Sequence, residues 1–109
     1  MLNKQIPEIA KKLREELHPS SGLVRIYAYG SRVRGDEEVG SDLDLLVELK
    51  QVTPEIKRQI QDRAWELSLV SGFVISVLIV SEEVFERSPL SVSGFAENIR
   101  RHGVEVLAS

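Results

Sequence analysis

The sequence predicts an α/β (α+β) fold: a small mixed three-stranded sheet flanked by helices. Three apolar segments, residues 23–29, 42–49 and 73–80, have the short length and the branched or aromatic composition of strands. The stretches around them repeat apolar residues every three or four positions, as one face of a helix does. About a dozen residues without a clear helical pattern join the first two strands. Because a parallel pair needs a long crossover, the sheet need not be purely parallel.

The predicted helices are marked by apolar spacing and by the residues at their ends. Residues 2–18 place Ile6, Ile9, Ala10, Leu13 and Leu17 on one helical face. The next helix has Thr53 as its cap and Pro54 at its first position, and it is expected to end near residue 70, before Gly72.

The last third of the chain is predicted to be helical after its strand. Ser81 can cap a short helix over residues 82–86, and a final helix is expected from about residue 91, with Gly103 at its C-terminal end. The face that this final helix is expected to bury consists of Val92, Phe95, Ala96 and Ile99. The tail, residues 104–109, is too short to assign.

Length and composition predict a single domain over residues 1–109 in a cytoplasmic protein. The chain has no cysteine, which excludes disulfides and thiolate metal sites. The N-terminus lacks the apolar run of a signal peptide, and no segment is long enough to span a membrane. The formal charge of −3 supplies no basic surface, so binding to duplex nucleic acid is not expected.

A glycine–serine turn stands directly after the first predicted strand. Glycine lets backbone N–H groups approach an anion closely, and Gly30 is followed by the hydroxyl of Ser31. Arg34 can reach a phosphate with its planar guanidinium. Such a turn alone is more often a simple loop, but in combination with the acids that follow it, it predicts a phosphate-binding site.

Two aspartates open the second predicted strand. Asp42 and Asp44 are two residues apart, so they share one face of a strand with Cα atoms about 6.6 Å apart. Mg²⁺ is commonly held by one or two carboxylates together with substrate phosphates. The aspartates and the turn would jointly hold a nucleoside triphosphate with its metal ions.

This arrangement resembles the signature of the DNA polymerase β-like nucleotidyltransferase superfamily. The motif consists of Gly30-Ser31-x-x-Arg34-Gly35 followed by Ser41-Asp42-x-Asp44-Leu45. The size of the chain, its leading helix and its closing Arg-Arg-His-Gly-Val-Glu-Val region are similar to the minimal nucleotidyltransferases, which pair as antitoxins with helical HEPN proteins. The resemblance implies a nucleotidyltransferase-like core.

The resemblance also implies roles for residues of the motif. It assigns nucleotide binding to Gly30, Ser31, Arg34 and Ser41, and catalysis with Mg²⁺ binding to Asp42 and Asp44. It further implies transfer of a nucleoside monophosphate, AMP from ATP by preference, to a hydroxyl on a HEPN-type partner protein. The sequence leaves the acceptor and the oligomeric state open.

The third predicted strand departs from the family pattern. The family usually carries a third carboxylate there, whereas the only polar residue of residues 74–80 is Ser76. A serine hydroxyl is a weaker metal ligand and a poor general base. Acids of the loop (Asp36, Glu37, Glu38) or of a partner could replace it, although the sequence favours a solvated acidic loop for these three residues. The alternative function is therefore a weakly active or inactive nucleotide-binding module that neutralises its partner by contact alone.

Three aromatic residues have a structural and a functional interpretation. Tyr27 and Tyr29 share one face of the first strand and are expected in the core rather than stacked on a nucleotide. Trp65 lies opposite the buried stripe of its helix, with Leu69. The sequence favours a half-buried position for Trp65 over a role as an anchor at an interface.

Overall fold

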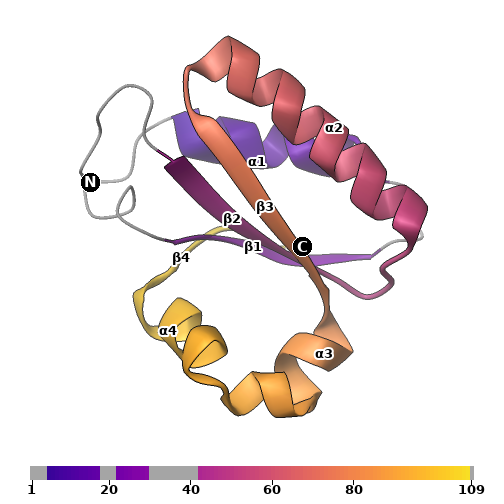
Figure 1. The fold of residues 1–109 in the computed structure, drawn as a ribbon, viewed down its shortest axis with the longest axis vertical. Coiled ribbons are helices and arrows are strands. Elements are labelled where there is room, and N and C mark those ends of the chain that lie inside the picture. Colours follow the sequence, from indigo (N-terminus) through magenta and orange to yellow (C-terminus); the bar gives the residue numbers. More distant parts are fainter. Residues whose placement is uncertain (1–4, 18–21, 30–41, 109) are drawn as a thin grey trace.

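The computed structural model describes residues 5–17, 22–29 and 42–108, which form a mixed sheet with helices on both faces (Figure 1). Its elements in chain order are α1 (Gln5–Glu15), β1 (Leu23–Tyr29), β2 (Asp42–Leu49), α2 (Pro54–Ser71), β3 (Val74–Ser81), α3 (Glu82–Arg87), the 3-10 helix η3 (Pro89–Val92), α4 (Gly94–His102) and β4 (Val104–Ala108). The predicted fold class is confirmed, but the predicted number of strands is wrong, because the sheet has four strands instead of three.

The sheet has four strands in the order β3-β2-β1-β4. β1 is antiparallel to both of its neighbours, whereas β2 and β3 are parallel and are joined through α2. The sheet is therefore mixed, as the short connection between β1 and β2 indicates. β4 is the strand that the sequence leaves unassigned, and it forms because the tail pairs with the free edge of β1.

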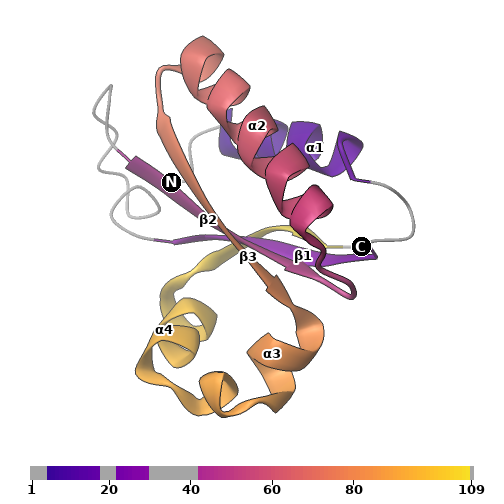
Figure 2. The same ribbon diagram turned by 45° about the vertical axis from the view of Figure 1, so that its right-hand side comes forward.

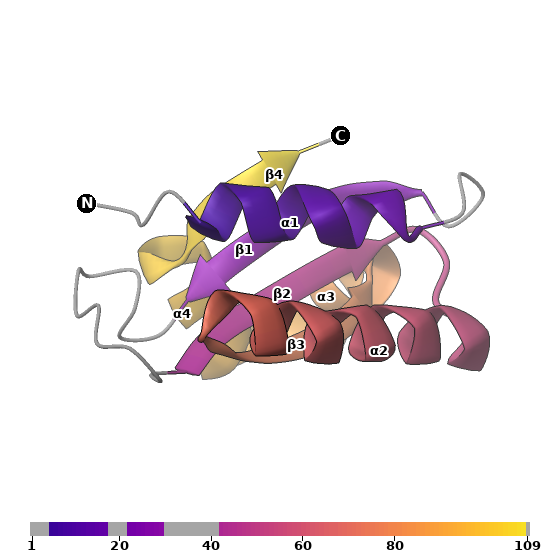
Figure 3. The same cartoon turned by 90° about the horizontal axis from the view of Figure 1, so that it is seen from above.

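The helices form one layer on each side of the sheet. Helices α1 and α2 lie side by side over one face (Figure 3), and α3 and α4 lie against the other (Figure 2). Alternation along β2 divides its side chains between these layers. Leu43, Leu45 and Val47 join the larger core with α1 and α2, and Leu46 joins a smaller core with α3 and α4.

The helix ends follow their capping residues. The Ile56 N–H donates to Thr53 Oγ1 at 3.1 Å, and Gly72 ends α2 with φ at +84°, a conformation that glycine adopts without strain. The Val84 N–H donates to Ser81 Oγ at 3.1 Å, so Ser81 caps α3 as predicted.

The start of the last helix differs from the prediction. Helix α4 begins at Gly94, where the Ala96 N–H donates to Ser93 Oγ at 3.2 Å. Because Val92 belongs to η3 and not to α4, it is 81% exposed instead of buried. Ala96 and Ile99 are buried as expected, and Phe95 is 42% exposed.

Gly103 joins α4 to β4, and its close backbone contact with α4 can be tested by substitution. Its N–H donates to the Ile99 carbonyl at 2.8 Å, and a Cβ at this position would lie 2.5 Å from that oxygen. Gly103→Ala is expected to destabilise the protein by about 1–3 kcal/mol, since the close contact forces the backbone to shift. Urea denaturation measures the change. Gly94→Ala is the matched control, because a Cβ there meets no atom within 4 Å and stability should not decrease.

Candidate active site

The two aspartates of the motif lie at the start of β2. Asp42 is exposed, Asp44 is half-buried, and Leu43 between them points into the larger core. Since alternate residues of a strand share a face, both aspartates point to the side of the sheet that carries α3 and α4. The two aspartates therefore share one face of the strand, opposite Leu43, as predicted.

The site has a marked excess of negative charge. Burial and the nearby Asp42 carboxylate raise the pKa of Asp44. Burial and the Asp44 carboxylate likewise raise the pKa of Tyr29, which pairs with Asp44 across β1 and β2. Among the described residues, no Lys, Arg or His forms an ion pair with either aspartate. The pair therefore has the donor atoms that suit a hard divalent cation, and no described residue compensates its charge through an ion pair.

Ser76 lies next to Asp44 on the edge strand. The two residues are register partners in the parallel pair of β2 and β3, so their side chains are on the same face. The Ser76 side chain is exposed. Within the described part of the chain, no carboxylate or imidazole joins Asp42 and Asp44 in a three-ligand group. The serine thus stands where a third ligand to the same ion would be well placed.

Several predicted site residues cannot be placed relative to this pair. The nucleotide-binding candidates Gly30, Ser31, Arg34 and Ser41, and the loop acids Asp36, Glu37 and Glu38, lie outside the described residues. They connect Tyr29 to Asp42, and Tyr29 is beside Asp44 in the sheet.

Aromatic packing joins α4 to the face that carries the aspartates. The rings of Tyr29 and Phe95 meet edge to face, with centroids 6.0 Å apart, and Tyr27 packs against Phe85 of α3 at 6.2 Å. Both tyrosines are partly buried against the smaller core, which confirms their predicted position. Phe95, which the sequence assigns to the core, instead remains partly exposed on the same face as Asp44.

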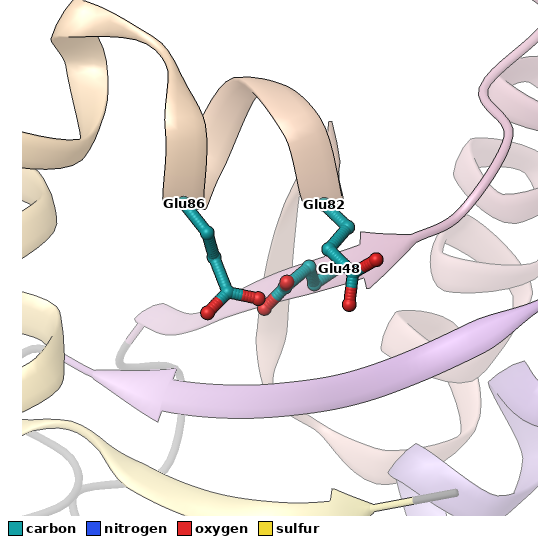
Figure 4. A group of neighbouring side chains, drawn as sticks. All are labelled: Glu48, Glu82 and Glu86. Atoms are coloured by element: carbon teal, nitrogen blue, oxygen red, sulfur yellow. The ribbon is translucent and has the colours of Figure 1, made fainter.

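A second acidic group, which the sequence analysis missed, lies at the other end of β2. Glu48 is fully buried, and its carboxylate lies close to those of Glu82 and Glu86 of α3 (Figure 4). The alternation that places Asp42 and Asp44 on one face also places Glu48 there, and this signal could have identified it.

Trp65 contradicts the half-buried position that the sequence favours. Its side chain is 66% exposed, and its neighbours Leu69 and Val70 are 68% and 83% exposed. The reason is that α2 turns Ile60, Ala64 and Leu67 toward the sheet and α1, which leaves Trp65 on the outward side of the helix. No helix in the described part of the chain combines the length and the apolar character needed to cross a bilayer.

Comparison with known proteins identifies the family to which this chain belongs. The family model described as nucleotidyltransferase domain matches residues 6–105, and the chain belongs to that family. A protein of Methanocaldococcus jannaschii, named for an inferred protein adenylyltransferase activity, is 29% identical over 105 residues. That match covers 94% of this chain and 99% of the relative.

Solved structures share the fold at low sequence identity. One is a mutant MntA–HpeT toxin–antitoxin crystal structure (TM-score 0.64, 17% identity, 99% of this chain and 75% of that chain). Another is a toxin–antitoxin solved with AMP-PNP (TM-score 0.64, 19% identity, covering 94% of this chain and 72% of that chain). A third contains the tri-AMPylated HEPN toxin of Shewanella oneidensis with its MNT antitoxin (TM-score 0.59, 18% identity, covering 98% of this chain and 74% of that chain).

Proposed function

We propose that this chain is a Mg²⁺-dependent adenylyltransferase that moves AMP from ATP to a hydroxyl of a HEPN-type partner protein, and thereby acts as its antitoxin. The observation that carries the proposal is the pairing of Asp42 and Asp44 on one face, with no cation of the described residues to neutralise them. Membership of the nucleotidyltransferase family supports the reaction class.

The relatives support ATP as the AMP donor, a protein hydroxyl as the acceptor and a HEPN-type protein as the partner. The name of the M. jannaschii relative points to adenylyl transfer onto protein. One structural neighbour was solved with an ATP analogue, and another contains an AMPylated HEPN toxin with its antitoxin. This chain shares its fold with them over nearly its whole length.

Each motif residue has a role in this reaction. Asp42 and Asp44 would hold Mg²⁺, which stabilises the charge that develops on the reacting phosphate. Gly30, Ser31, Arg34 and Ser41 would bind the triphosphate, so that the acceptor hydroxyl attacks the α-phosphorus and pyrophosphate leaves. The neutral hydroxyl of Ser76 would accept a proton poorly, and we therefore expect slow transfer.

Replacement of Asp42 tests the proposal. Asp42→Ala is expected to slow transfer of AMP to the partner by on the order of a thousandfold, because charge stabilisation by a bound metal contributes several kcal/mol. The mass of the intact partner, followed over time with saturating ATP and Mg²⁺, measures the rate. Asp62→Ala removes an exposed acid of α2, on the opposite side of the sheet, and should leave the rate unchanged.

The position of Ser76 favours one alternative function. A module that binds nucleotide without turnover would neutralise the partner by contact alone, and the absence of a third carboxylate beside Asp44 fits it. The same assay separates the two functions. A partner that is inhibited by the unmutated protein yet keeps its original mass supports the binding module and contradicts the enzyme.

A further inference from the structure

The buried Glu48 carboxylate is unexplained by the adenylyltransferase site. It lies on the same face of β2 as Asp42 and Asp44, but the buried Leu46 separates it from them. Glu48 is 0% exposed, and neither of its carboxylate oxygens has a hydrogen-bond partner among the described residues. A buried ionised carboxylate without hydrogen bonds is costly, so a positive charge, either a proton or a cation, is needed to neutralise it.

Two further carboxylates converge on Glu48 from α3. Glu82 and Glu86 are four residues apart, one helical turn, and both side chains point toward Glu48 (Figure 4). One carboxylate oxygen from each of the three residues lies within 4.8 Å of the other two. Glu82 is partly buried and Glu86 is exposed, so the group is open to solvent on one side.

The positive charge near this group is insufficient to balance it. The Nε of Arg25, a residue of β1, lies 3.5 Å from Glu48 Oε1, but the two atoms lack the geometry of a hydrogen bond. The same Nε is 3.7 Å from Glu105 Oε1, so Arg25 is shared between two acids. Arg87 and Arg100 act on Glu86 from a distance and form no ion pair with the group. Three carboxylates thus face one shared guanidinium.

The pKa of Glu48 also reflects the excess of carboxylates over positive charges. Burial and the neighbouring Glu86 raise the pKa of Glu48 to about 8. A proton and a metal ion compete for such oxygens.

We propose that Glu48, Glu82 and Glu86 form a second divalent-cation site, separate from the nucleotide site, which takes a hard ion of the size of Ca²⁺. Ca²⁺ binds six to eight oxygens at 2.3–2.6 Å in a flexible geometry, so three carboxylate oxygens that all lie within 4.8 Å of one another can bind it together. Mg²⁺ requires near-ideal octahedral geometry and gives up its water ligands reluctantly, so it suits this group of side chains less well. The bound ion would link α3 to β2. It would thereby stabilise the position of α3 in the layer of α3 and α4, which lies on the same face of the sheet as the nucleotide site.

The experiment measures thermal unfolding of the full chain carrying Asp42→Asn and Asp44→Asn, with CaCl₂ or with chelator. In this background the proposed nucleotide site has lost both carboxylates. Calcium at about a hundred times its dissociation constant is expected to raise the unfolding midpoint by about 10 °C. Adding Glu82→Gln or Glu86→Gln should abolish the shift. Adding Glu83→Gln, which removes an exposed acid of the same helix, should preserve it.

Two outcomes overturn the site. If calcium does not change the midpoint of thermal unfolding of the variant with Asp42→Asn and Asp44→Asn, Glu48 is neutralised by a proton. A shift that survives both Glu82→Gln and Glu86→Gln places the ion elsewhere. Glu48→Gln provides a second check, since calorimetric titration of that variant should show loss of one calcium site. Because no readout depends on AMP transfer, these results stand apart from the success or failure of the adenylyltransferase proposal.

Discussion

Ser76→Asp is expected to accelerate AMP transfer by on the order of a hundredfold. Ser76 is the register partner of Asp44, so an aspartate there would place a third carboxylate on the same face, beside the proposed metal ligands. A positioned general base typically contributes a hundredfold or more, and a carboxylate also binds Mg²⁺ better than a hydroxyl does. Initial rates with saturating ATP, Mg²⁺ and partner protein measure the effect.

Ser76→Asn is the matched control for this prediction. It has nearly the size of aspartate and adds no negative charge, so it should give at most a small change in rate. Because the Ser76 side chain is exposed, Ser76→Asn should leave the urea midpoint nearly unchanged, whereas repulsion from Asp44 should lower that of Ser76→Asp modestly when Mg²⁺ is absent. An unchanged rate in a folded Ser76→Asp protein would mean that this position of β3 does not face the reacting groups.

Phe85→Ala is expected to lower the free energy of unfolding by about 3–5 kcal/mol. Phe85 is 1% exposed at the centre of the smaller core, where its ring meets that of Tyr27. The Arg100 guanidinium lies 4.7 Å from the ring centroid, and its Nη2 donates to the Phe85 carbonyl at 2.8 Å. Truncation leaves a cavity and removes this cation–π contact. Guanidinium denaturation measures the loss, which is a large share of the stability of a typical domain.

Phe95→Ala is the comparison for Phe85. Phe95 is 42% exposed and touches Tyr29 at the margin of the same core, so its truncation should cost about 1 kcal/mol. Equal losses for the two variants would contradict the assignment of Phe85 as the residue that holds α3 against the sheet.

The parts of the fold that the sequence could predict depend on local chemistry. Thr53, Pro54 and Gly72 mark the ends of α2 because caps and left-handed glycine act within one turn. Asp42 and Asp44 could be assigned to one face because side chains alternate along any strand. In both cases the decisive interactions involve residues close together in the chain.

The parts that could not be predicted depend on contacts between distant residues. The tail from Val104 becomes a strand only because the free edge of β1 accepts it, and its own pattern is too short to indicate this. Glu48 could be assigned to the face of Asp42 by alternation, but its partners come from α3, which only the folded chain brings close. Trp65 is exposed because no described element covers the outward side of α2.

The most direct test of the proposed function follows the fate of each phosphate of ATP. The protein and its HEPN-type partner are incubated with Mg²⁺ and ATP that is labelled at either the α- or the γ-phosphate. Adenylyl transfer predicts that the α-label appears on the partner, that the γ-label leaves with pyrophosphate, and that Asp42→Ala removes the α-label from the partner. A partner that is inhibited but carries neither label, or that carries the γ-label, would contradict the assignment of this chain as an adenylyltransferase.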